Sequence, residues 1–220
     1  RGLLLAISHE LRSPLTRARL NTELLPDTLD VQPSRDALLR DLGEMRDLIT
    51  DLLESERLGQ GHVALQVEPT DVAELAHEVV ATFTGLGGSN VPTTVAAHVD
   101  VAPDLHLVAI DRTRVRMLLR NLLDNALRHS VGARQAPQVT LHPAGQGVAI
   151  TVRDYGPGVP DAALPHLAEA FYRPDAARER ATGGVGLGLH LCKLVALAHG
   201  GSFEVRNAQP GLEVVVVLPG

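Results

Sequence analysis

The sequence is poor in cysteine and in aromatic side chains. It contains a single cysteine, Cys192, and aromatic residues make up only 2% of its 220 residues. One cysteine excludes an internal disulfide and is typical of a reducing compartment. Because tryptophan is absent and other aromatics are scarce, aliphatic side chains must fill the hydrophobic core.

Long apolar runs are missing as well. No stretch reaches the roughly 18 apolar residues of a membrane-spanning helix, so we expect no membrane segment in this chain. The chain has no signal peptide and no initiator Met, and it begins within a helical pattern, so we interpret it as a fragment of a longer protein. Its net charge of −6 argues against binding to nucleic acid or to a membrane surface.

The first part of the chain has the pattern of a helical hairpin. A first helix is predicted over residues 1–25, and the turn "PDTLDVQPS" follows, with Ser34 as the expected N-cap of a second helix. Spacings of four and three define an apolar seam on the second helix: Leu38, Leu42, Met45, Ile49 and Leu52. Two such seams cannot be buried by one hairpin, which favours a homodimer with a four-helix bundle. "RLGQGH" at 57–62 is interpreted as a linker.

After this linker the pattern changes to alternating strands and helices. Helices are predicted over 71–83, 111–129 and 187–199. Strands are predicted over 63–69, 93–101, 105–110, 138–143, 147–153, 202–207 and 212–219. Strands paired with helices, some of them adjacent and antiparallel, predict an α+β sandwich of one sheet against a layer of helices.

Helix 111–129 carries polar residues that its apolar stripe does not require. Asn121, Asn125 and Arg128 recur at i, i+4 and i+7, although Asn is a modest helix former. Solvent exposure explains such a row, and so does a site where amide oxygens face Mg²⁺ and a guanidinium faces phosphate. The pattern alone weighs these two readings evenly. A second row on this helix, Arg112, Arg116 and Arg120, is interpreted as a solvated face.

Two glycine-rich segments follow. "VRDYGPGVP" at 152–160 places Asp154 at a strand end beside Gly156 and Gly158. This pattern alone favours an ordinary turn, and the alternative is a carboxylate that accepts a hydrogen bond from an amino-bearing ring. "GGVGLGLHLCK" at 183–193 opens a helix, where backbone N–H groups can bind phosphate. It matches neither the dinucleotide fingerprint nor the P-loop.

Taken in order, five segments resemble a known family. "SHELRSPLT", "NLLDNALRHS", "DYGPG", "FYRPDAARER" and "GGVGLGL" are similar to the H, N, G1, F and G2 boxes of the sensor histidine kinases of two-component signalling. The sequence "FYRPDAARERATGGVGLGL" resembles most the kinases of the Cpx envelope-stress type. The resemblance implies a dimerisation and phosphotransfer domain over 1–62 and a Bergerat-type ATP-binding domain over 63–220.

The resemblance also implies roles for individual residues. His9 matches the phosphoacceptor, Glu10 the adjacent acid, and Ser13 the position that orients water in dephosphorylation of the regulator. Asn121 and Asn125 match the Mg²⁺–ATP asparagines, and Asp154 the adenine-binding aspartate. Residues 171–180 match the ATP lid. The remaining implied ATP-binding residues are Arg128, Gly156, Gly158, Tyr172, Arg173, Arg178, Arg180, Gly184, Gly186, Leu187 and Gly188.

Three positions depart from the family pattern. Arg128 stands where lysine is usual, Val185 where threonine is common, and Ser13 where threonine or asparagine is more usual. The first keeps the charge but changes its geometry, the second removes a hydroxyl, and the third bears on phosphatase efficiency. Pro14 removes the helical partner of the Glu10 carbonyl, so we expect a bend in the helix beside His9.

The function implied is ATP-dependent autophosphorylation on His9, phosphotransfer to an aspartate of a response-regulator receiver domain, and phosphatase activity toward that regulator. The chain is then the cytoplasmic portion of a bacterial inner-membrane sensor protein. Two alternatives remain: an ATPase clamp of the gyrase or Hsp90 kind, and a dimerisation scaffold that binds ATP without chemistry.

Overall fold

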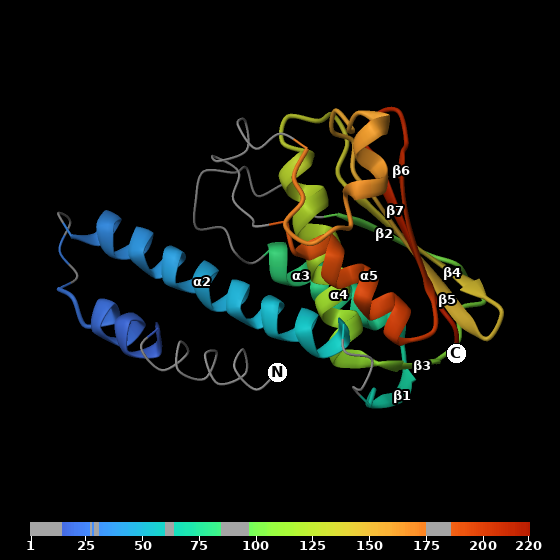
Figure 1. Cartoon of the computed structure of the whole chain (residues 1–220), viewed down its shortest axis with the longest axis horizontal. Coiled ribbons are helices and arrows are strands. Elements are labelled where there is room, and N and C mark those ends of the chain that lie inside the picture. The colour runs from blue at the N-terminus through green and yellow to red at the C-terminus, as the bar shows by residue number, and fades with distance from the viewer. Residues whose placement is uncertain (1–14, 27, 29–30, 60–63, 85–96, 175–185) are drawn as a thin grey trace. The chain divides into compact units, whose positions relative to one another are not determined.

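The computed structural model describes residues 15–26, 28, 31–59, 64–84, 97–174 and 186–220 (Figure 1). The chain divides into two compact units, residues 1–60 and 61–220. None of the helices in the described part of the chain combines the length and the hydrophobicity that crossing a bilayer requires.

The first unit contains two helices, as the sequence predicts. The described part of the first covers residues 15–23, and α2 runs over Gln32–Gly59. The prediction that Ser34 caps α2 is wrong, because helical hydrogen bonding is already present from Val31, whose carbonyl accepts from Arg35 N at 2.9 Å. Ser34 therefore lies in the first turn of α2. The helix also continues through Gly59, into the segment predicted as a linker.

The side chain of Arg35 closes the end of the first helix. Its Nε donates to the carbonyl of Thr22 at 3.3 Å, and its Nη2 donates to the carbonyl of Glu23 at 3.2 Å. The last carbonyls of a helix have no partner within the helix. A guanidinium that reaches them from α2 therefore both caps the first helix and fixes the hairpin.

The second unit contains two sheets and three α-helices among its described residues. The helices are α3 (Val72–Thr84), α4 (Arg112–His129) and α5 (Gly188–Ala198), and a 3-10 helix, η1, spans Asp161–His166. The strands are β1 (Val67–Thr70), β2 (His98–Val101), β3 (Val108–Asp111), β4 (Gln138–Ala144), β5 (Gly147–Arg153), β6 (Ser202–Asn207) and β7 (Leu212–Leu218).

The larger sheet has the order β2-β4-β5-β7-β6, and β1 and β3 form a separate antiparallel pair. Within the larger sheet β2 runs parallel to β4, while the other neighbours are antiparallel. The two strands predicted near 93–101 and 105–110 both form, but they join different sheets. The prediction of an α+β sandwich is confirmed, with the small β1–β3 sheet as an addition.

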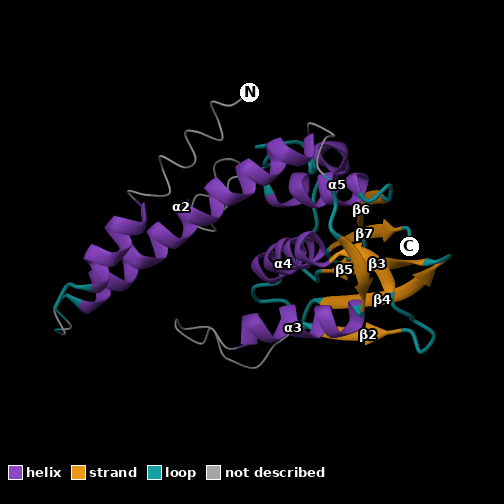
Figure 2. Ribbon diagram, turned by 90° about the horizontal axis from the view of Figure 1, so that it is seen from below, coloured by secondary structure: helices purple, strands orange, loops and turns teal. Residues whose placement is uncertain are grey.

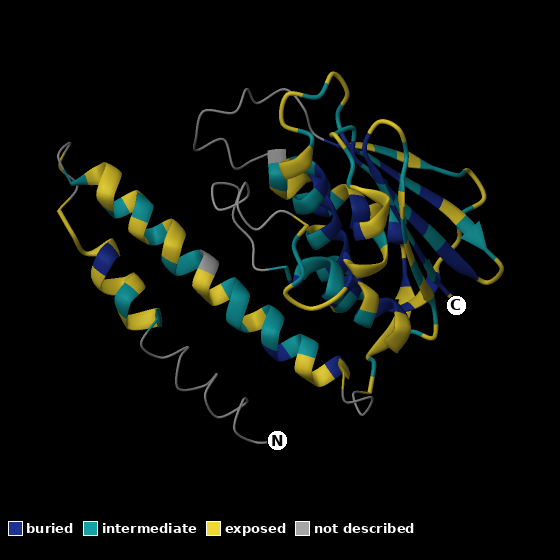
Figure 3. Cartoon of the chain, turned by 45° about the horizontal axis from the view of Figure 1, so that its top comes forward, coloured by how far each residue is buried: buried dark blue, intermediate teal, exposed yellow. Residues whose placement is uncertain are grey.

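The three helices cover one face of the larger sheet (Figure 2). Alternate residues of β5 point to this face, and Val148, Ile150 and Val152 are all buried there. Figure 3 shows the buried residues concentrated where helices and sheet meet. This layer is aliphatic, as the scarcity of aromatic residues requires.

Asp111 is buried and connects the start of α4 to two other parts of this unit, through its carboxylate and through its backbone N–H. Its Oδ1 accepts from Arg114 N at 3.1 Å and so caps α4, and its Oδ2 accepts from Gln66 N at 3.0 Å. The Asp111 N–H donates to Nε2 of His199, directly after α5, at 3.1 Å. The N-terminus of α4 and the C-terminus of α5 are thus held together, and their opposite ends carry the predicted site residues.

Candidate functional site

Helix α4 supplies the asparagines that the sequence singles out. Asn121 and Asn125 are both half-buried. The Asn121 amide nitrogen donates to the carbonyl of Met117 at 3.1 Å, which leaves its Oδ1 directed away from that bond. The side chain of Asn125 makes no hydrogen bond to any residue that the structure describes. Of the two, Asn125 is therefore the freer to bind a ligand.

Asp154 is a buried carboxylate with one oxygen held by backbone. It directly follows β5 and is 4% exposed. Its Oδ1 accepts from Gly156 N at 2.9 Å and from Leu212 N at 3.2 Å. Within the described chain Oδ2 accepts no hydrogen bond, so this oxygen is available to a donor on a ligand, such as an exocyclic amino group.

Two glycines bring the motifs together by close approach. A Cβ at Gly156 would lie 2.2 Å from the carbonyl oxygen of His129 at the end of α4, so only glycine fits there. A Cβ at Gly188, the first residue of α5, would lie 3.3 Å from Oδ1 of Asn121. The Asp154 loop therefore lies against the C-terminal end of α4, and the N-terminus of α5 lies against Asn121 on the same helix.

The first residue of the predicted lid, which covers residues 171–180, makes a backbone contact with Gly186. Phe171 N donates to the carbonyl of Gly186 at 2.9 Å, and both residues have positive φ, 66° and 78°. Leu187 is buried, whereas Tyr172 and Arg173 are half-buried on the other side of this contact. Arg178, Arg180 and Gly184 lie outside the described residues.

The residues of the predicted phosphoacceptor motif, His9, Glu10, Ser13 and Pro14, also lie outside the described residues. Their roles, and the bend expected at Pro14, stay predictions. The structure therefore gives geometry for the predicted nucleotide side of the site.

The predicted phosphate-binding arginine has a partner on its own helix. Arg128 Nε is 2.9 Å from Oδ2 of Asp124, one turn earlier, and both side chains are partly exposed. An exposed pair of this kind contributes little to stability, so Arg128 can exchange Asp124 for a stronger anion such as phosphate at small cost.

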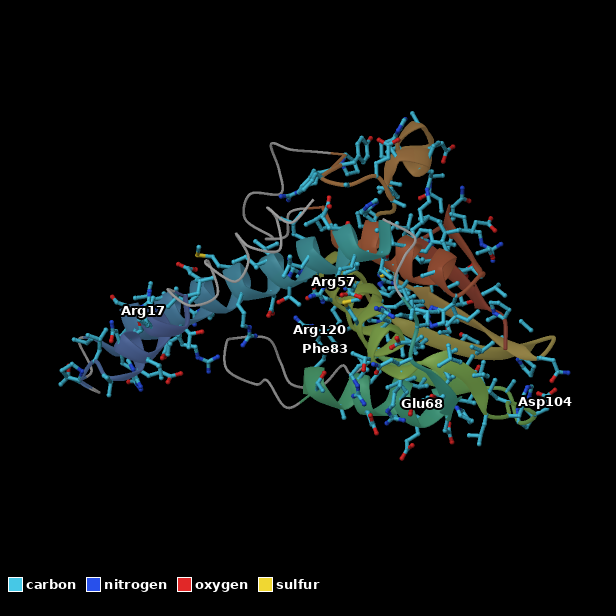
Figure 4. All side chains as sticks on the ribbon, turned by 60° about the horizontal axis from the view of Figure 1, so that its bottom comes forward. Arg17, Arg57, Glu68, Phe83, Asp104 and Arg120 are labelled. Carbon is cyan, nitrogen blue, oxygen red and sulfur yellow. The ribbon has the colours of Figure 1, made fainter. Side chains whose placement is uncertain are left out.

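The other arginine row of α4 is more than a solvated face. Arg112 and Arg116 both donate to the carboxylate of Glu78 on α3, the first at 2.8 Å. The hydrogen bond from Arg116, with Arg112 alongside, lowers the pKa of Glu78 below its ordinary value. Arg120 continues the row along α4 (Figure 4). These ion pairs join α3 to α4.

The sequence did not predict that Leu212 and Asn207 hold Asp154 and the loop that follows it. The turn between β6 and β7 supplies Leu212 N, and Asn207 binds the loop after Gly158 through Val159. The letters "NAQPG" at 207–211 signal a turn between two strands. They do not indicate that its tip packs against a loop more than fifty positions earlier.

Two family models match the chain. The model for histidine kinase-, DNA gyrase B- and HSP90-like ATPases matches residues 110–220, and the model for the His Kinase A (phospho-acceptor) domain matches residues 1–61. The chain therefore belongs to the histidine kinase-, DNA gyrase B- and HSP90-like ATPase family. With the phospho-acceptor domain ahead of it, the chain is a member of the sensor histidine kinases.

Named relatives agree with this assignment. The chain is 37% identical over 213 residues to the sensor protein SphS of Synechococcus elongatus, a match that covers 91% of this chain and 50% of SphS. It is 30% identical over 220 residues to the signal transduction histidine-protein kinase AfsQ2 of Streptomyces coelicolor, with 93% and 39% covered. The chain thus spans half or less of the length of these relatives.

Solved structures show the same fold. Full-length ShkA in complex with AMPPNP matches with a TM-score of 0.81 and 26% identity, over 98% of this chain and 45% of ShkA. The histidine kinase AdeS of Acinetobacter baumannii matches with a TM-score of 0.65 and 21% identity, over 96% of this chain and 97% of AdeS. The second match supports the fold alone.

Proposed function

We propose that this chain is the catalytic core of a sensor histidine kinase that phosphorylates itself on His9 with ATP and passes the phosphoryl group to an aspartate of a response regulator. The observation that supports the proposal is that the Asp154 loop and the N-terminus of α5 both pack against α4, the helix that carries Asn121 and Asn125. A phospho-acceptor domain occupies the same chain.

The residues of the Asp154 loop, α4 and the N-terminus of α5 fit Mg²⁺–ATP. The free oxygen of Asp154 can accept from the amino group of adenine, and the backbone at Gly186 and Gly188 can approach phosphates. Asn125, with Asn121 beside it, would hold Mg²⁺, which in this family of reactions offsets the charge of the phosphates. Arg128 adds a guanidinium for the same anion.

The proposed chemical step uses groups from both units. A ring nitrogen of His9 attacks the γ-phosphorus, a nitrogen–phosphorus bond forms, and the bond from phosphorus to the bridging oxygen of ADP breaks. Glu10 takes or holds the ring proton, which makes the attacking nitrogen nucleophilic. The phosphohistidine is then the donor for an aspartate on the receiver domain, a step that needs positioning above all.

The finer features of the proposal follow from the resemblance. The chain forms a homodimer through its helical hairpin, and it removes phosphate from its regulator with the help of Ser13. It is the cytoplasmic portion of an inner-membrane sensor, in keeping with relatives that are longer and named as sensors. The likeness to kinases of the Cpx type rests on residues 171–189 and stays a prediction.

Incubation with ATP labelled on its γ-phosphate tests the proposal directly. We expect label on the chain that is stable in alkali and lost in acid, as phosphohistidine is, and transfer of this label to a receiver domain. The Asn125→Ala variant should bind Mg²⁺–ATP about 10- to 100-fold more weakly, as loss of a ligand group implies. ATP hydrolysis without label would favour a gyrase- or Hsp90-like clamp instead, and binding without chemistry would favour a scaffold.

A further inference from the structure

The turn between β6 and β7, residues 207–212, packs directly against Asp154. Leu212 N donates to Oδ1 of Asp154 at 3.2 Å, and Asp154 N donates to the carbonyl of Leu212 at 2.9 Å. Gly211 has a φ of 90°, and a Cβ there would lie 2.0 Å from the Asp154 carbonyl oxygen. The position of this turn therefore decides where the Asp154 carboxylate points.

Arg153 holds the same turn from the opposite face of the sheet. Its Nη2 donates to the carbonyls of Ala208 at 3.0 Å and Pro210 at 3.4 Å. The guanidinium lies over the ring of Tyr155, 4.8 Å from the ring centroid, and the Tyr155 hydroxyl donates to Oε1 of Gln138 at 3.2 Å. Because side chains alternate along β5, Arg153 faces away from the helices that carry the predicted nucleotide-binding residues.

Asn207 connects the start of the turn to the glycine loop after Asp154. Its Nδ2 donates to the carbonyl of Val159 at 2.8 Å and to Oδ1 of Asp161 at 2.8 Å, and its Oδ1 accepts from Val159 N at 3.1 Å. A Cβ at Gly158 would lie only 2.9 Å from the same Oδ1. The amide of Asn207 thus fixes the loop and the turn relative to each other.

The chemistry of Arg153 indicates a role other than stability. Its Nε is buried and has no acceptor among the residues that the structure describes. A buried donor without a partner is a cost to the folded state, so an aliphatic side chain of similar length would serve the fold as well or better. What such a side chain cannot supply is the pair of hydrogen bonds to the turn.

We propose that the β6–β7 turn sets the selectivity of the site for adenine over guanine, with Arg153 and Asn207 as its positioning residues. The proposal rests on the proposed function, in which Asp154 accepts from the amino group of adenine. Guanine presents a carbonyl oxygen at the corresponding ring position, and a carboxylate repels it. Discrimination between adenine and guanine therefore depends on how firmly the turn holds the Asp154 carboxylate in the orientation in which it accepts from the amino group.

The test compares Arg153→Met with Arg206→Met in the full chain. Arg206 lies on the same sheet face and pairs with Glu213, and among the residues that the structure describes it donates to no carbonyl of the turn. The dissociation constants of ATP and GTP are measured by calorimetry with Mg²⁺, and thermal unfolding is followed for each variant. Arg153→Met removes both hydrogen bonds to the turn carbonyls and so loosens the turn whose Leu212 N–H binds the Asp154 carboxylate. We expect it to lower the GTP-to-ATP ratio of dissociation constants about tenfold, the scale of one hydrogen bond to a charged group, with little change in Tm. Arg206→Met should keep the parent ratio.

A second variant keeps the result decisive if Arg153→Met fails to fold. Asn207→Asp keeps the acceptor for Val159 N but loses both donated bonds, and it places a carboxylate beside Asp161. It too should lower the ratio, and Arg153→Lys, which retains a donor, should fall between parent and Arg153→Met. A parent-like ratio in both Arg153→Met and Asn207→Asp overturns the inference, as does an equal loss in Arg206→Met. A parent chain that binds no ATP overturns the proposed function itself.

Discussion

The two units of this chain differ in where they keep their large apolar side chains. Among the described residues, the large apolar side chains with almost no exposed surface all belong to the second unit, and they include Leu75, Ile110, Leu118 and Leu141. In the hairpin, Leu24 is 82% exposed and Met45 is 51% exposed. A sheet covered by helices completes its core within one chain, whereas two helices leave one apolar seam uncovered. We therefore expect the second unit to fold by itself and the hairpin to fold with a second copy, as in the proposed homodimer.

The proposed chemistry is divided between the same two units, with the acceptor His9 in the hairpin and the ATP-binding residues in the second unit. Replacing His9 by Gln tests this division with the largest expected effect. We expect complete loss of phosphohistidine, because the acceptor nitrogen is removed. The affinity for Mg²⁺–ATP should stay near that of the parent, since none of the predicted ATP-binding residues lies in the hairpin. Labelling followed by gel analysis measures the first and calorimetry the second. Labelling at the parent level would show that another residue is the acceptor.

Replacing Met45 by Gln sharpens the comparison at the predicted dimer seam. Burying a methionine side chain contributes about 1.5–3 kcal/mol, and a symmetric dimer buries two copies. The dissociation constant of the dimer should therefore rise about 10²- to 10⁴-fold. Arg40→Gln, an exposed position outside the seam, is the matched control. Sedimentation equilibrium measures both, and a dimer unaffected by Met45→Gln would break the comparison.

A substitution in the core of the second unit should change the free energy of unfolding by an intermediate amount. Leu118 is 0% exposed, and Leu118→Ala should lower the free energy of unfolding by about 2–5 kcal/mol, through lost burial and the cavity left behind. Leu107 is 60% exposed in the same unit, so Leu107→Ala should cost less than about 1 kcal/mol. Urea unfolding of the two variants, at equal protein concentration, gives the difference.

The smallest effect is expected where α3 meets α4. The pKa of Glu78 is lowered in the folded protein by Arg116 and Arg112, so its contribution to stability is present above the unfolded pKa and is lost as the pH falls through the folded one. Glu78→Gln should therefore be slightly less stable than the parent at about pH 7, and the gap should close below about pH 4. Urea unfolding across this range measures it; a gap that is independent of pH would contradict the ion pairs.

Local patterns predicted the elements of the fold well. The apolar stripe of α4, from Val115 to Ala126, contains the residues that the structure buries. Periodicity identifies such a helix because one face alone must meet the core. The start of α2 was predicted less well, since a serine in a turn sequence signals a cap even when the helix has already begun before it.

Contacts between distant parts of the sequence could not be predicted in the same way. β2 and β3 were recognised as strands, but which sheet each joins depends on pairing with β4 and β1. Asn121 and Gly188 were predicted only as separate site residues, and the structure brings them close to each other. The motif that contains Arg153 indicated no role for it, because the turn carbonyls that it contacts lie more than fifty positions later in the chain.

The order of strands in the larger sheet has a consequence for the speed and sequence of folding. β4 and β5 are neighbours in the chain and in the sheet, so their hairpin closes a very short loop. β2 joins β4 in parallel only after the whole of α4 has been bridged, which is a slow, non-local pairing. We expect the β4–β5 hairpin to form first and β2 to dock last. The same edge should open first in native-state hydrogen exchange, well before the strands at the centre.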